Sequence, residues 1–365
     1  MNTKTTLSFI GLGLIGGSIA KALKERTKHC FIKVYDQDHK TLERAKQEGT
    51  ADETYSCLTP SFFQCDVLFL CAPVKINCEI LENYHGQFSK DCIITDVGSV
   101  KSPIHHIIDQ LCLNNQFIGG HPMAGSERYG YSNSSASLLE NAYYILTPTP
   151  FAKEADIQKL HTLVTLMGAL PYLLTADYHD SATAAISHLP HLIASSLVNL
   201  VKKEDDSHAT FKTLAAGGFK DITRIASSSP ALWQQICMEN REKILYYLDS
   251  YMEDLSVLRK QLDNREDSLL YNFFSSAQLY RDSFLETRSG PFIKQYVLTI
   301  DIPDKKGALA HVINLLSEND INIKNLGIVH NREEQEGALR MEFYSKPEYE
   351  SALKLLKEKK ITVQS

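Results

Sequence analysis

The sequence predicts three successive structural parts: an α/β domain with a doubly wound sheet, an all-helical domain, and a small β-α-β-β-α-β domain. Short apolar runs alternate with amphipathic segments over residues 1–150. Helical periodicity then continues over residues 151–290, and strand and helix patterns mix again over 294–365. A chain of 365 residues is long enough for two or three domains.

Six short apolar runs in the first region are expected to be strands, with helices between them. Such runs are typical of a parallel sheet that is covered on both faces. The loops at the carboxyl ends of these strands are where functional residues are expected. The predicted strands are 6–10, 31–36, 67–71, 92–96, 116–119 and 143–147.

The first strand runs directly into Gly11-x-Gly13-x-x-Gly16, and Asp36 ends the second strand, twenty positions after Gly16. In this motif the first glycine permits a tight turn, the second leaves room for a pyrophosphate, and the third lets the helix pack closely. An ordinary glycine-rich turn is the alternative, but it leaves Asp36 unexplained. The pattern predicts a Rossmann-type domain whose dinucleotide contacts are Gly11, Gly13, Leu14, Ile15, Gly16 and Asp36.

Asp36 also predicts which dinucleotide binds. A carboxylate at this point accepts hydrogen bonds from the ribose hydroxyls of NAD and repels the 2′-phosphate of NADP. Gln37 and Asp38 follow, so no arginine stands there to receive that phosphate. The predicted cofactor is therefore NAD.

The character of the chain changes near Pro148-Thr149-Pro150. An amphipathic helix is expected over 152–168 and one more strand over 169–174, and the sequence from 176 to about 288 is helical. Pro230 is expected to start a long helix with one apolar stripe. Such a stripe is usually core or subunit interface, which favours a homodimer through this domain. The stripe consists of Leu245, Leu248, Met252, Leu255, Leu258 and Leu262.

The last region follows a break at Ser289-Gly290-Pro291. Its pattern predicts the order strand, helix, strand, strand, helix, strand, which is that of the ferredoxin-like plait. The predicted elements are 295–302, 307–319, 321–330, 337–345, 347–358 and 361–364.

The composition excludes several classes of protein. A net charge of −6 gives no electrostatic reason to expect nucleic acid or an anionic membrane as partner. No apolar run approaches the roughly 20 residues that cross a bilayer. The amino terminus enters a strand directly, which predicts a cytoplasmic protein. The eight cysteines include no CxxC pair, so buried reduced thiols are expected rather than a metal site or disulfides.

Two polar segments follow predicted strands of the first domain. Asp96-Val97-Gly98-Ser99-Val100-Lys101 leaves one strand, and Ser102-Pro103 is expected to start a helix with Ser102 as its N-cap. Ser99 would then lie on the cofactor side, or in a simple turn. His121 follows the next strand, and a pKa near 6.5 suits a group that takes a proton from a hydroxyl as hydride departs. The alternative is a histidine bonded to a loop carbonyl.

Two further segments lie in the helical region. His188 and His191 share a helix face, and Pro190 between them removes the usual partner of the Ile186 carbonyl, which favours a polar pocket. A zinc site would need further ligands at suitable spacing, so no metal is predicted. Lys220 and Arg224 also share a helix face and are able to receive a dianion, although a surface pair between Asp221 and Arg224 is the alternative.

Taken together, these segments resemble the NAD-dependent prephenate dehydrogenases of tyrosine biosynthesis that carry a C-terminal ACT domain. The resemblance runs nearly end to end through GLGLIGGS, DVGSVK, GGHPMAGSE, SHLPH, GGFKDITRIA and the later Trp233. The tail matches the ACT pattern at IPDKKGAL and NDINI.

The resemblance implies oxidative decarboxylation: prephenate loses hydride from C4 to NAD and its ring carboxylate as CO₂, giving 4-hydroxyphenylpyruvate. By this resemblance His121 accepts the proton of the C4 hydroxyl, Ser99 orients that hydroxyl, and Arg224 binds a substrate carboxylate. The other implied substrate contacts are Lys220, His179, His188, His191, Glu127 and Trp233.

The ACT domain implies tyrosine as an effector, with Gly307 and Asn322 at its site; a domain that serves only assembly is the alternative. Three other functions remain open at this point. Arogenate dehydrogenase performs the same chemistry on the amino-acid analogue. A β-hydroxyacid dehydrogenase of the 6-phosphogluconate type would have a catalytic lysine on the helical domain and no ACT tail. A non-catalytic sensor of NAD and tyrosine would not need Ser99, His121 and Arg224.

Overall fold

A computed structural model describes most of the chain, which divides into two compact units, Met1–Leu255 and Ser256–Ser365. Glu127, one of the implied substrate contacts, is outside the described residues. Those residues are 5–27, 29–125, 128–286, 296–303, 305–330, 336–359 and 361–364.

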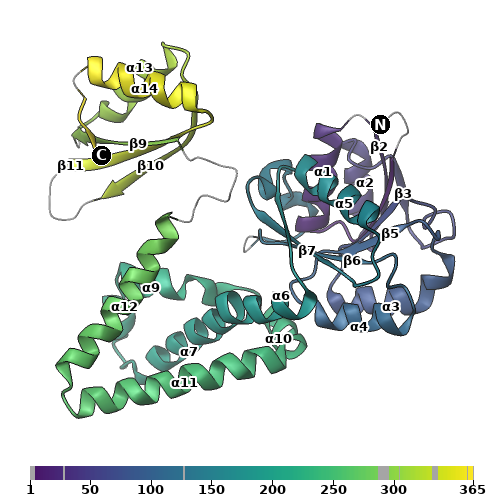
Figure 1. Ribbon diagram of the computed structural model, residues 1–365, viewed down its shortest axis with the longest axis horizontal. Helices are drawn as coiled ribbons and strands as arrows, with labels where there is room; N and C mark the ends of the chain where they lie inside the picture. The colour runs from purple at the N-terminus through teal and green to yellow at the C-terminus, as the bar shows by residue number, and fades with distance from the viewer. Residues whose placement is uncertain are drawn as a thin grey trace. The chain divides into compact units, whose positions relative to one another are not determined.

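The first unit opens with a five-stranded parallel sheet in the order β3-β2-β1-β4-β5 (Figure 1). The chain leaves β1 toward β2 on one side and returns to β4 on the other, so a crevice forms at the carboxyl ends of these strands. The glycine motif follows β1 directly. Four of the five strands were predicted, and the short β3 was not. Their bounds are Thr5–Ile10, Cys30–Tyr35, Glu53–Tyr55, Val67–Leu70 and Ile93–Asp96 for β1 to β5.

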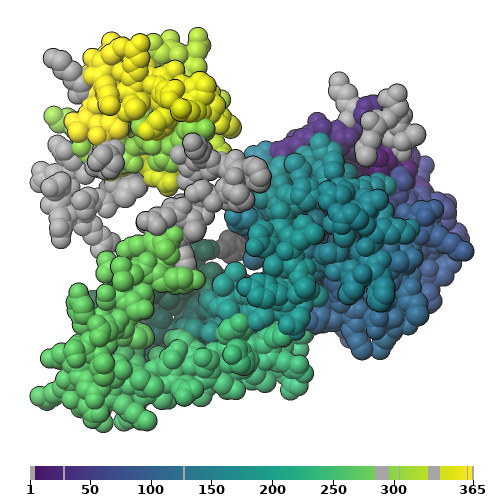
Figure 2. All heavy atoms as spheres, viewed as in Figure 1, coloured from purple at the N-terminus to yellow at the C-terminus, as the bar shows by residue number. Residues whose placement is uncertain are grey.

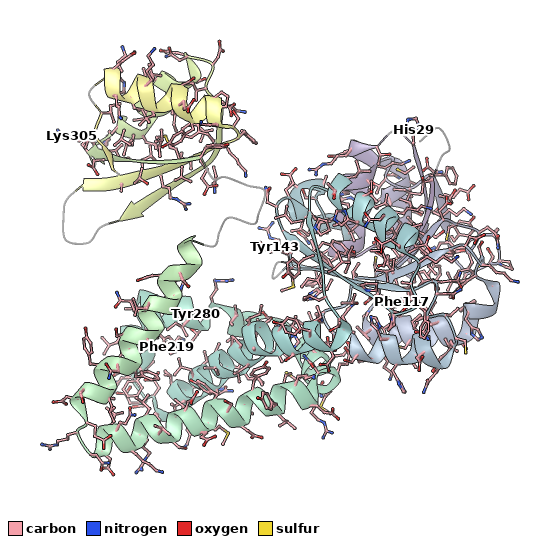
Figure 3. All side chains as sticks on the ribbon, viewed as in Figure 1. His29, Phe117, Tyr143, Phe219, Tyr280 and Lys305 are labelled. Carbon is pink, nitrogen blue, oxygen red and sulfur yellow. The ribbon has the colours of Figure 1, made fainter. Side chains whose placement is uncertain are left out.

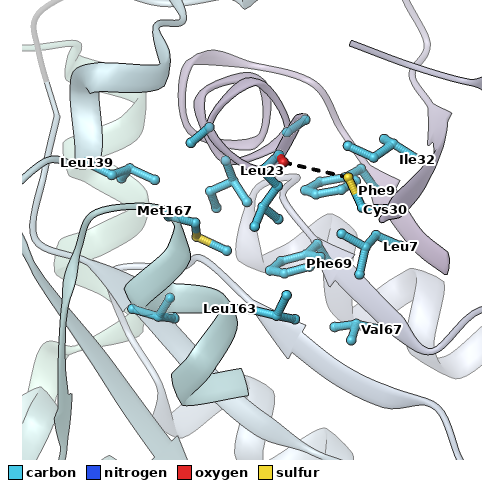
Figure 4. Close-up of a cluster of buried hydrophobic side chains, with 14 of the residues drawn as sticks. Leu7, Phe9, Leu23, Cys30, Ile32, Val67, Phe69, Leu139, Leu163 and Met167 are labelled. Carbon is cyan, nitrogen blue, oxygen red and sulfur yellow. Dashed lines mark hydrogen bonds between the residues drawn. The ribbon is translucent and has the colours of Figure 1, made fainter. Parts of the chain in front are cut away.

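Helices cover both faces of this sheet (Figure 1), as predicted. On one face the rings of Phe9 and Phe69 stack with centroids 4.6 Å apart (Figure 4). On the other face Phe117, labelled in Figure 3, packs among Phe62 and Phe63. The first face is covered by α1 (Leu14–Arg26), α2 (His39–Gln47) and α5 (Glu154–Leu166), and the second by α3 (Val74–Tyr84) and α4 (Ser102–Gln110).

A second sheet continues this domain and corrects the prediction of a parallel sheet throughout. It has the order β6-β7-β8, with β6 (Ile118–Pro122) antiparallel to β7 (Tyr143–Pro148) and β7 parallel to β8 (Leu170–Leu173). The described part of 123–142 holds two short 3-10 turns, and antiparallel neighbours need no crossover helix. The expected boundary at residue 150 falls inside this domain, because β8 pairs with β7.

The helical region starts with a continuous helix, Ala176–Glu204. It comprises α6 (Ala176–Thr183), a π turn (Ala184–His188) and α7 (Leu189–Glu204). The π turn lies just before Pro190, whose missing N–H disturbs the ladder at the expected point.

The same helix is long and apolar enough, by length and composition, to cross a membrane, with a mean hydropathy of 1.3 over its most apolar window. The expectation that no such run exists is therefore wrong. However, His179 and Asp180 near its start are buried and bond to residues of the α/β domain. This end of the helix therefore packs on protein.

The remaining helices of the region are α8 (Thr210–Leu214), α9 (Gly217–Thr223), α10 (Pro230–Glu239) and α11 (Arg241–Asp263). Pro230 starts α10 and not the long helix, because the chain breaks at the buried Asn240 before α11 begins. The helix α11 lies at the surface in Figure 2. Much of the predicted leucine stripe on it is exposed, which fits a subunit interface better than a core. Its exposed members are Leu245, Met252, Leu255 and Leu262.

The second unit contains α12 (Asp267–Glu286) and a four-stranded antiparallel sheet in the order β10-β11-β9-β12. The chain order confirms the predicted β-α-β-β-α-β arrangement, in which β11 lies between β9 and β10. Its elements are β9 (Tyr296–Pro303), α13 (Ala308–Ser317), β10 (Ile323–His330), β11 (Glu336–Phe343), α14 (Lys346–Glu358) and β12 (Val363–Gln364).

Replacing Phe9 with Ala should lower the free energy of unfolding by about 3–5 kcal/mol, because the buried ring leaves a cavity beside Phe69. Urea unfolding followed by circular dichroism measures the loss. Phe151→Ala is the matched control, since the Phe151 ring is 68% exposed and its removal should change stability by no more than about 0.5 kcal/mol. Equal losses in the two variants would contradict the packing described.

Candidate active site

The glycine turn after β1 forms an open cradle. Gly11 has a φ of +87°, and a Cβ on Gly16 would lie 2.5 Å from the Gly11 carbonyl oxygen, so both positions require glycine. A Cβ on Gly13 would meet nothing within 4 Å. The space above Gly13 and the N-terminus of α1 is therefore free for a phosphate group.

Asp36 is held beside this turn. One oxygen of its carboxylate accepts the main-chain N–H of Leu12 at 2.7 Å, and the other accepts that of Asp38 at 2.8 Å. Gly13 and Asp36 both line a cavity of about 560 Å³ with a largely apolar wall. A cradle, a fixed acid and an apolar wall match the pyrophosphate, ribose and adenine of a dinucleotide. The wall includes Tyr35, Leu58, Ile76, Ile80 and Tyr84.

His121 on β6 starts a chain of three side chains. Its Nδ1 lies 2.7 Å from Nε2 of His179, and Nδ1 of His179 lies 2.8 Å from Oδ1 of Asp180. An ionised carboxylate only accepts hydrogen bonds, so His179 donates to it from Nδ1. If both imidazoles are neutral, Nε2 of His179 carries no proton and accepts a hydrogen bond from the Nδ1–H group of His121. This arrangement leaves Nε2 of His121 without a proton and able to act as a base.

Asp180 also caps the N-terminus of the helix α4. Its carboxylate accepts the main-chain N–H groups of Lys101 and Ser102, each at 2.7 Å, and the hydroxyl of Ser102 donates to it as well. The prediction that Ser102 is the N-cap is therefore wrong: Ser102 is the first helical residue, and Lys101 holds the cap position. A carboxylate from another helix performs the capping, which favours its charged form at a helix N-terminus.

The electrostatics of this chain favour a neutral base. Burial lowers the pKa of His121 well below its usual value, and the nearby His179, Lys101 and His188 lower it further. Burial alone would raise the pKa of Asp180, but the hydrogen bonds from His179, Ser102 and the main chain lower it overall. His121 is thus unprotonated, and Asp180 ionised, at neutral pH.

A second cluster adjoins the first through Asn240. The side-chain amide of Asn240 donates to the Asp180 carbonyl at 2.8 Å and lies 3.1 Å from Nδ1 of His188. Trp233 packs edge-on against His188 and stacks on His191 at a centroid distance of 3.4 Å. His191 and Trp233 also line a cavity of about 250 Å³.

Arg224 brings positive charge to this second cluster. Its guanidinium lies near enough to His191 to lower the pKa of that imidazole further, after the effect of burial. Arg224 itself is exposed, at the start of a 3-10 turn that follows α9. The site thus combines a base at one end with a cation at the other.

Two family models match the chain. The nucleotide-binding domain of prephenate dehydrogenase matches residues 19–173, and the dimerization domain of prephenate dehydrogenase matches residues 175–276. Together they cover more than half of the sequence. The chain belongs to the prephenate dehydrogenase family.

Individual relatives agree with this family. Prephenate dehydrogenase of Bacillus subtilis is 34% identical over 94% of this chain and 93% of its own length, and that of Lactococcus lactis is 32% identical over 95% and 96%. A solved prephenate dehydrogenase from A. aeolicus, in complex with hydroxyphenyl propionate and NAD+, superposes with a TM-score of 0.72 at 28% identity. It covers 77% of this chain and 98% of its own.

A solved arogenate dehydrogenase from Synechocystis has a TM-score of 0.70 at 30% identity and covers 76% of this chain and 99% of its own. These matches show an enzyme and support NAD as its cofactor, as predicted from Asp36. The dimerization domain supports the predicted homodimer.

Within this prephenate dehydrogenase family member, the predicted site residues divide into three groups. His121 and His179 are in direct side-chain contact, and His188 contacts Asn240. His179 and His188 are buried in this structure, and their place in the wall of the pocket stays a prediction. His191, Trp233 and Arg224 form the second cluster. Ser99 is half-buried in the loop after β5, and Lys220 is exposed on α9, outside the hydrogen bonds described above.

Sequence reasoning missed four residues that hold the site together. Asp96 and Lys101 stood in the DVGSVK segment, but only Ser99 was selected there. Asp180 directly follows His179, and an acidic neighbour of a histidine was an available signal. Asn240 could not be predicted, because no sequence pattern marks an amide that forms hydrogen bonds between two helices. Among the described residues, no group of three or more His, Cys, Asp or Glu side chains is placed to hold a metal ion.

The buried histidines should make stability depend on pH. Burial lowers the pKa of both His105 and His188 to about 4, below the ordinary value of about 6.5. The unfolded chain therefore binds protons first as the pH falls. The free energy of unfolding should drop between about pH 6.5 and 4, by ~1.4 kcal/mol per pH unit for each such histidine.

Urea unfolding at several pH values measures this slope. His105→Gln should reduce it, because one buried imidazole is removed. The control His29→Gln, at an exposed position labelled in Figure 3, should leave it unchanged. An unchanged slope in the H105Q protein would contradict the role of burial.

Proposed function

We propose that this enzyme catalyses the oxidative decarboxylation of prephenate to 4-hydroxyphenylpyruvate, with NAD as the hydride acceptor, in tyrosine biosynthesis. One observation carries the proposal. His121 presents an unprotonated Nε2 that is fixed through His179 and Asp180, in a chain whose relatives include prephenate dehydrogenases over most of its length.

His121 supplies the base. NAD, when bound, accepts the hydride that leaves C4 of the substrate. Nε2 of His121 takes the proton of the C4 hydroxyl, and the charge that develops on the imidazole is stabilised by His179 and the carboxylate of Asp180. Ser99 orients the hydroxyl. It stands in a loop that Asp96 fixes by accepting the Gly98 N–H at 2.9 Å.

Arg224 supplies the anion site. Prephenate carries two carboxylates, and a guanidinium grips one of them with two parallel hydrogen bonds. The exposed Lys220 on α9 adds positive charge, and His191 and Trp233 form the adjoining wall. Glu127, which the resemblance implies at the mouth of the pocket, stays a prediction because it is outside the described residues.

Six residues are proposed to form the NAD site. The pyrophosphate would be held over Gly13 and the first turn of α1, at Leu14 and Ile15, where the helix has no side-chain cap. Asp36 binds the adenosine ribose, and Gly11 and Gly16 shape the turn.

His121→Asn should lower kcat by ~10²–10⁴-fold, because general acid–base help of this size is lost. Absorbance of the reduced nicotinamide with prephenate and NAD measures it. His29→Asn, at the exposed amino end of the sheet, serves as the control with unchanged kcat. A normal kcat in the H121N enzyme would remove the base assignment.

Arg224→Ala should raise KM for prephenate strongly, since a charge-paired contact worth about 2–5 kcal/mol is lost. Steady-state kinetics at varied prephenate concentration measures the change. Lys202→Ala, an exposed cation on α7, should leave KM unchanged. Equal KM values for the R224A and wild-type enzymes would place the carboxylate elsewhere.

Arogenate is the second candidate substrate. The Synechocystis arogenate dehydrogenase matches this chain as well as the prephenate enzymes do in fold, and cyclohexadienyl dehydrogenase of Zymomonas mobilis is 32% identical over 75% of this chain. Reduced nicotinamide formation with each substrate separates the two. Prephenate is proposed as the better substrate, and a larger kcat/KM for arogenate would reverse the assignment.

The C-terminal sheet is proposed to be an ACT domain that binds tyrosine and inhibits the enzyme. Its order of elements and its sheet agree with that fold. Gly307 precedes α13 in a left-handed conformation with open space around it, and Asn322 lies exposed beyond the other end of this helix. Ten helical residues span ~15 Å, so one tyrosine would meet both positions only if two copies of the domain pair.

Removal of residues 291–365 should abolish inhibition by tyrosine and spare catalysis, because the effector site is lost and the catalytic residues remain. Asn322→Ala in the full chain should weaken the inhibition. Initial rates with and without tyrosine test both. Inhibition that persists in the shortened enzyme would mean that tyrosine competes with prephenate in the active site.

The proposed assembly is a cytoplasmic homodimer. The exposed leucines of α11 belong to the segment that matches the family's dimerization domain. We infer that the partner subunit covers this stripe.

A further inference from the structure

A buried ion pair lies directly behind His121. Lys101 and Asp96 are both 0% exposed, and the Lys101 ammonium contacts one oxygen of the Asp96 carboxylate. The same ammonium donates to the Gly120 carbonyl at 2.7 Å, and the other Asp96 oxygen accepts the Gly120 N–H at 3.1 Å. The pair therefore binds both main-chain groups of the residue that precedes the base.

The position of Gly120 in the sheet explains why side chains, and not a neighbouring strand, form hydrogen bonds with its main chain. β6 pairs with β7 on one side, where Gly120 faces Leu146. On the other side β5 ends at Asp96, and the bridge to β5 is made earlier, between Ile94 and Phe117. Buried main-chain groups need hydrogen-bond partners, and Asp96 and Lys101 supply them where the neighbouring strand has ended.

The fit around this point is close. A Cβ on Gly120 would lie 2.5 Å from the Asp96 carbonyl oxygen and 3.0 Å from the Tyr144 ring. A Cβ on the neighbouring Gly119 would lie 3.3 Å from Cδ of Lys101, so the Lys101 side chain packs against β6. Loss of this side chain would leave space beside β6 and allow His121 to move. A shift of 1 Å in a reacting group lowers the rate by as much as ~10²-fold.

Lys101 also connects the other parts of the site. Its main-chain N–H donates to Oδ1 of Asp180, the carboxylate oxygen that orients His179. Ser99 lies in the short loop between Asp96 and Lys101. Lys101 is thus bonded to Gly120 on the strand of His121, to Asp180, and to Asp96 at the start of the loop that holds Ser99.

We propose that Lys101 is a positioning residue for the reaction, which together with Asp96 fixes the main chain of Gly120 and so the imidazole of His121. This role rests on the proposed function of His121 as the base. The observation that favours a role beyond folding is the cost of the pair: burying two charges is expensive, and an apolar pair of similar volume would often be as stable.

The charge of Lys101 acts on His121 as well. Among the described residues, the titratable groups that act on His121 are His179, His188 and Lys101, and all three oppose its protonation. Lys101 in turn faces Asp96, Asp180 and Glu239, which favour its charged form against burial. Loss of the ammonium should therefore make His121 easier to protonate.

Lys101→Met tests the inference, with Lys33→Met as the matched control. Lys33 is also buried, and its ammonium donates to the carbonyls of Ser61 and Gln64 away from the site. K101M should lower kcat by about 10²-fold with KM changed far less. The acid limb of its kcat/KM profile should move to higher pH. K33M should lower the urea midpoint and leave kcat and the pH profile unchanged.

A double variant covers the case in which K101M does not fold. In Asp96→Asn, Lys101→Gln the introduced amides offer an acceptor to the Gly120 N–H and a donor to its carbonyl without charge, while the bond from the Gly98 N–H to Asp96 is lost. This protein should fold and keep a kcat above that of K101M, while its acid limb still lies at higher pH than that of the wild type. A failure of this variant to fold would assign the pair to folding and overturn the inference.

The remaining outcomes separate the two proposals. If the Lys101 variants match K33M in kcat and pH profile while H121N is inactive, only the role of Lys101 is wrong. If H121N is fully active, the proposed function itself fails, whatever the Lys101 variants show.

Discussion

The carboxylate of Asp180 is the interaction on which the site depends. It stands on α6, in the first turns of the helical region, yet its bonds reach into the α/β domain. One oxygen orients His179, and both oxygens receive main-chain N–H groups at the start of α4. Because a helix N-terminus favours negative charge, the fold itself keeps this carboxylate ionised and therefore an acceptor.

Burial and charge then have complementary effects along the site. Taking His121 out of water lowers its pKa and so keeps the ring neutral, with a free nitrogen that can accept a proton, whereas the guanidinium of Arg224 stays exposed. A neutral base suits removal of a hydroxyl proton, and an exposed cation suits capture of an anion from solvent. The second cluster, with Trp233 stacked on His191, connects the Arg224 end of the site to the His188 and Asn240 side.

The sequence predicted what depends on local pattern. The glycine motif, Asp36, the strands around them and the order of the C-terminal elements follow from periodicity and turn chemistry, and the structure confirms them. Patterns along the chain do not determine strand direction, so the antiparallel β6 and β7 were missed. The start of the long helix was misplaced because the break at Asn240 is stabilised by tertiary bonds to Asp180 and His188.

The site residues also divide into those that a local sequence pattern indicates and those that depend on tertiary contacts. His121 was selected because it was expected to follow a strand at this sheet edge, but the structure places it within β6, which extends to Pro122. The hydrogen-bond partners of His179 and His188 could not be predicted from the spacing of these residues, which were expected only to line the pocket. Their true partners, Asp180 and Asn240, are bonded across elements, and such pairs become visible only when the helix and the sheet are brought together.

The proton on the His121 ring tests the central claim most directly. Nitrogen-15 NMR of the histidine-labelled enzyme at neutral pH, with H121N to assign the signals, reports which ring nitrogen carries it. The hydrogen-bond chain from Asp180 requires a protonated Nδ1 and a bare Nε2. A His121 signal with the proton on Nε2 would contradict this account, because the nitrogen that faces the substrate could not then act as the base.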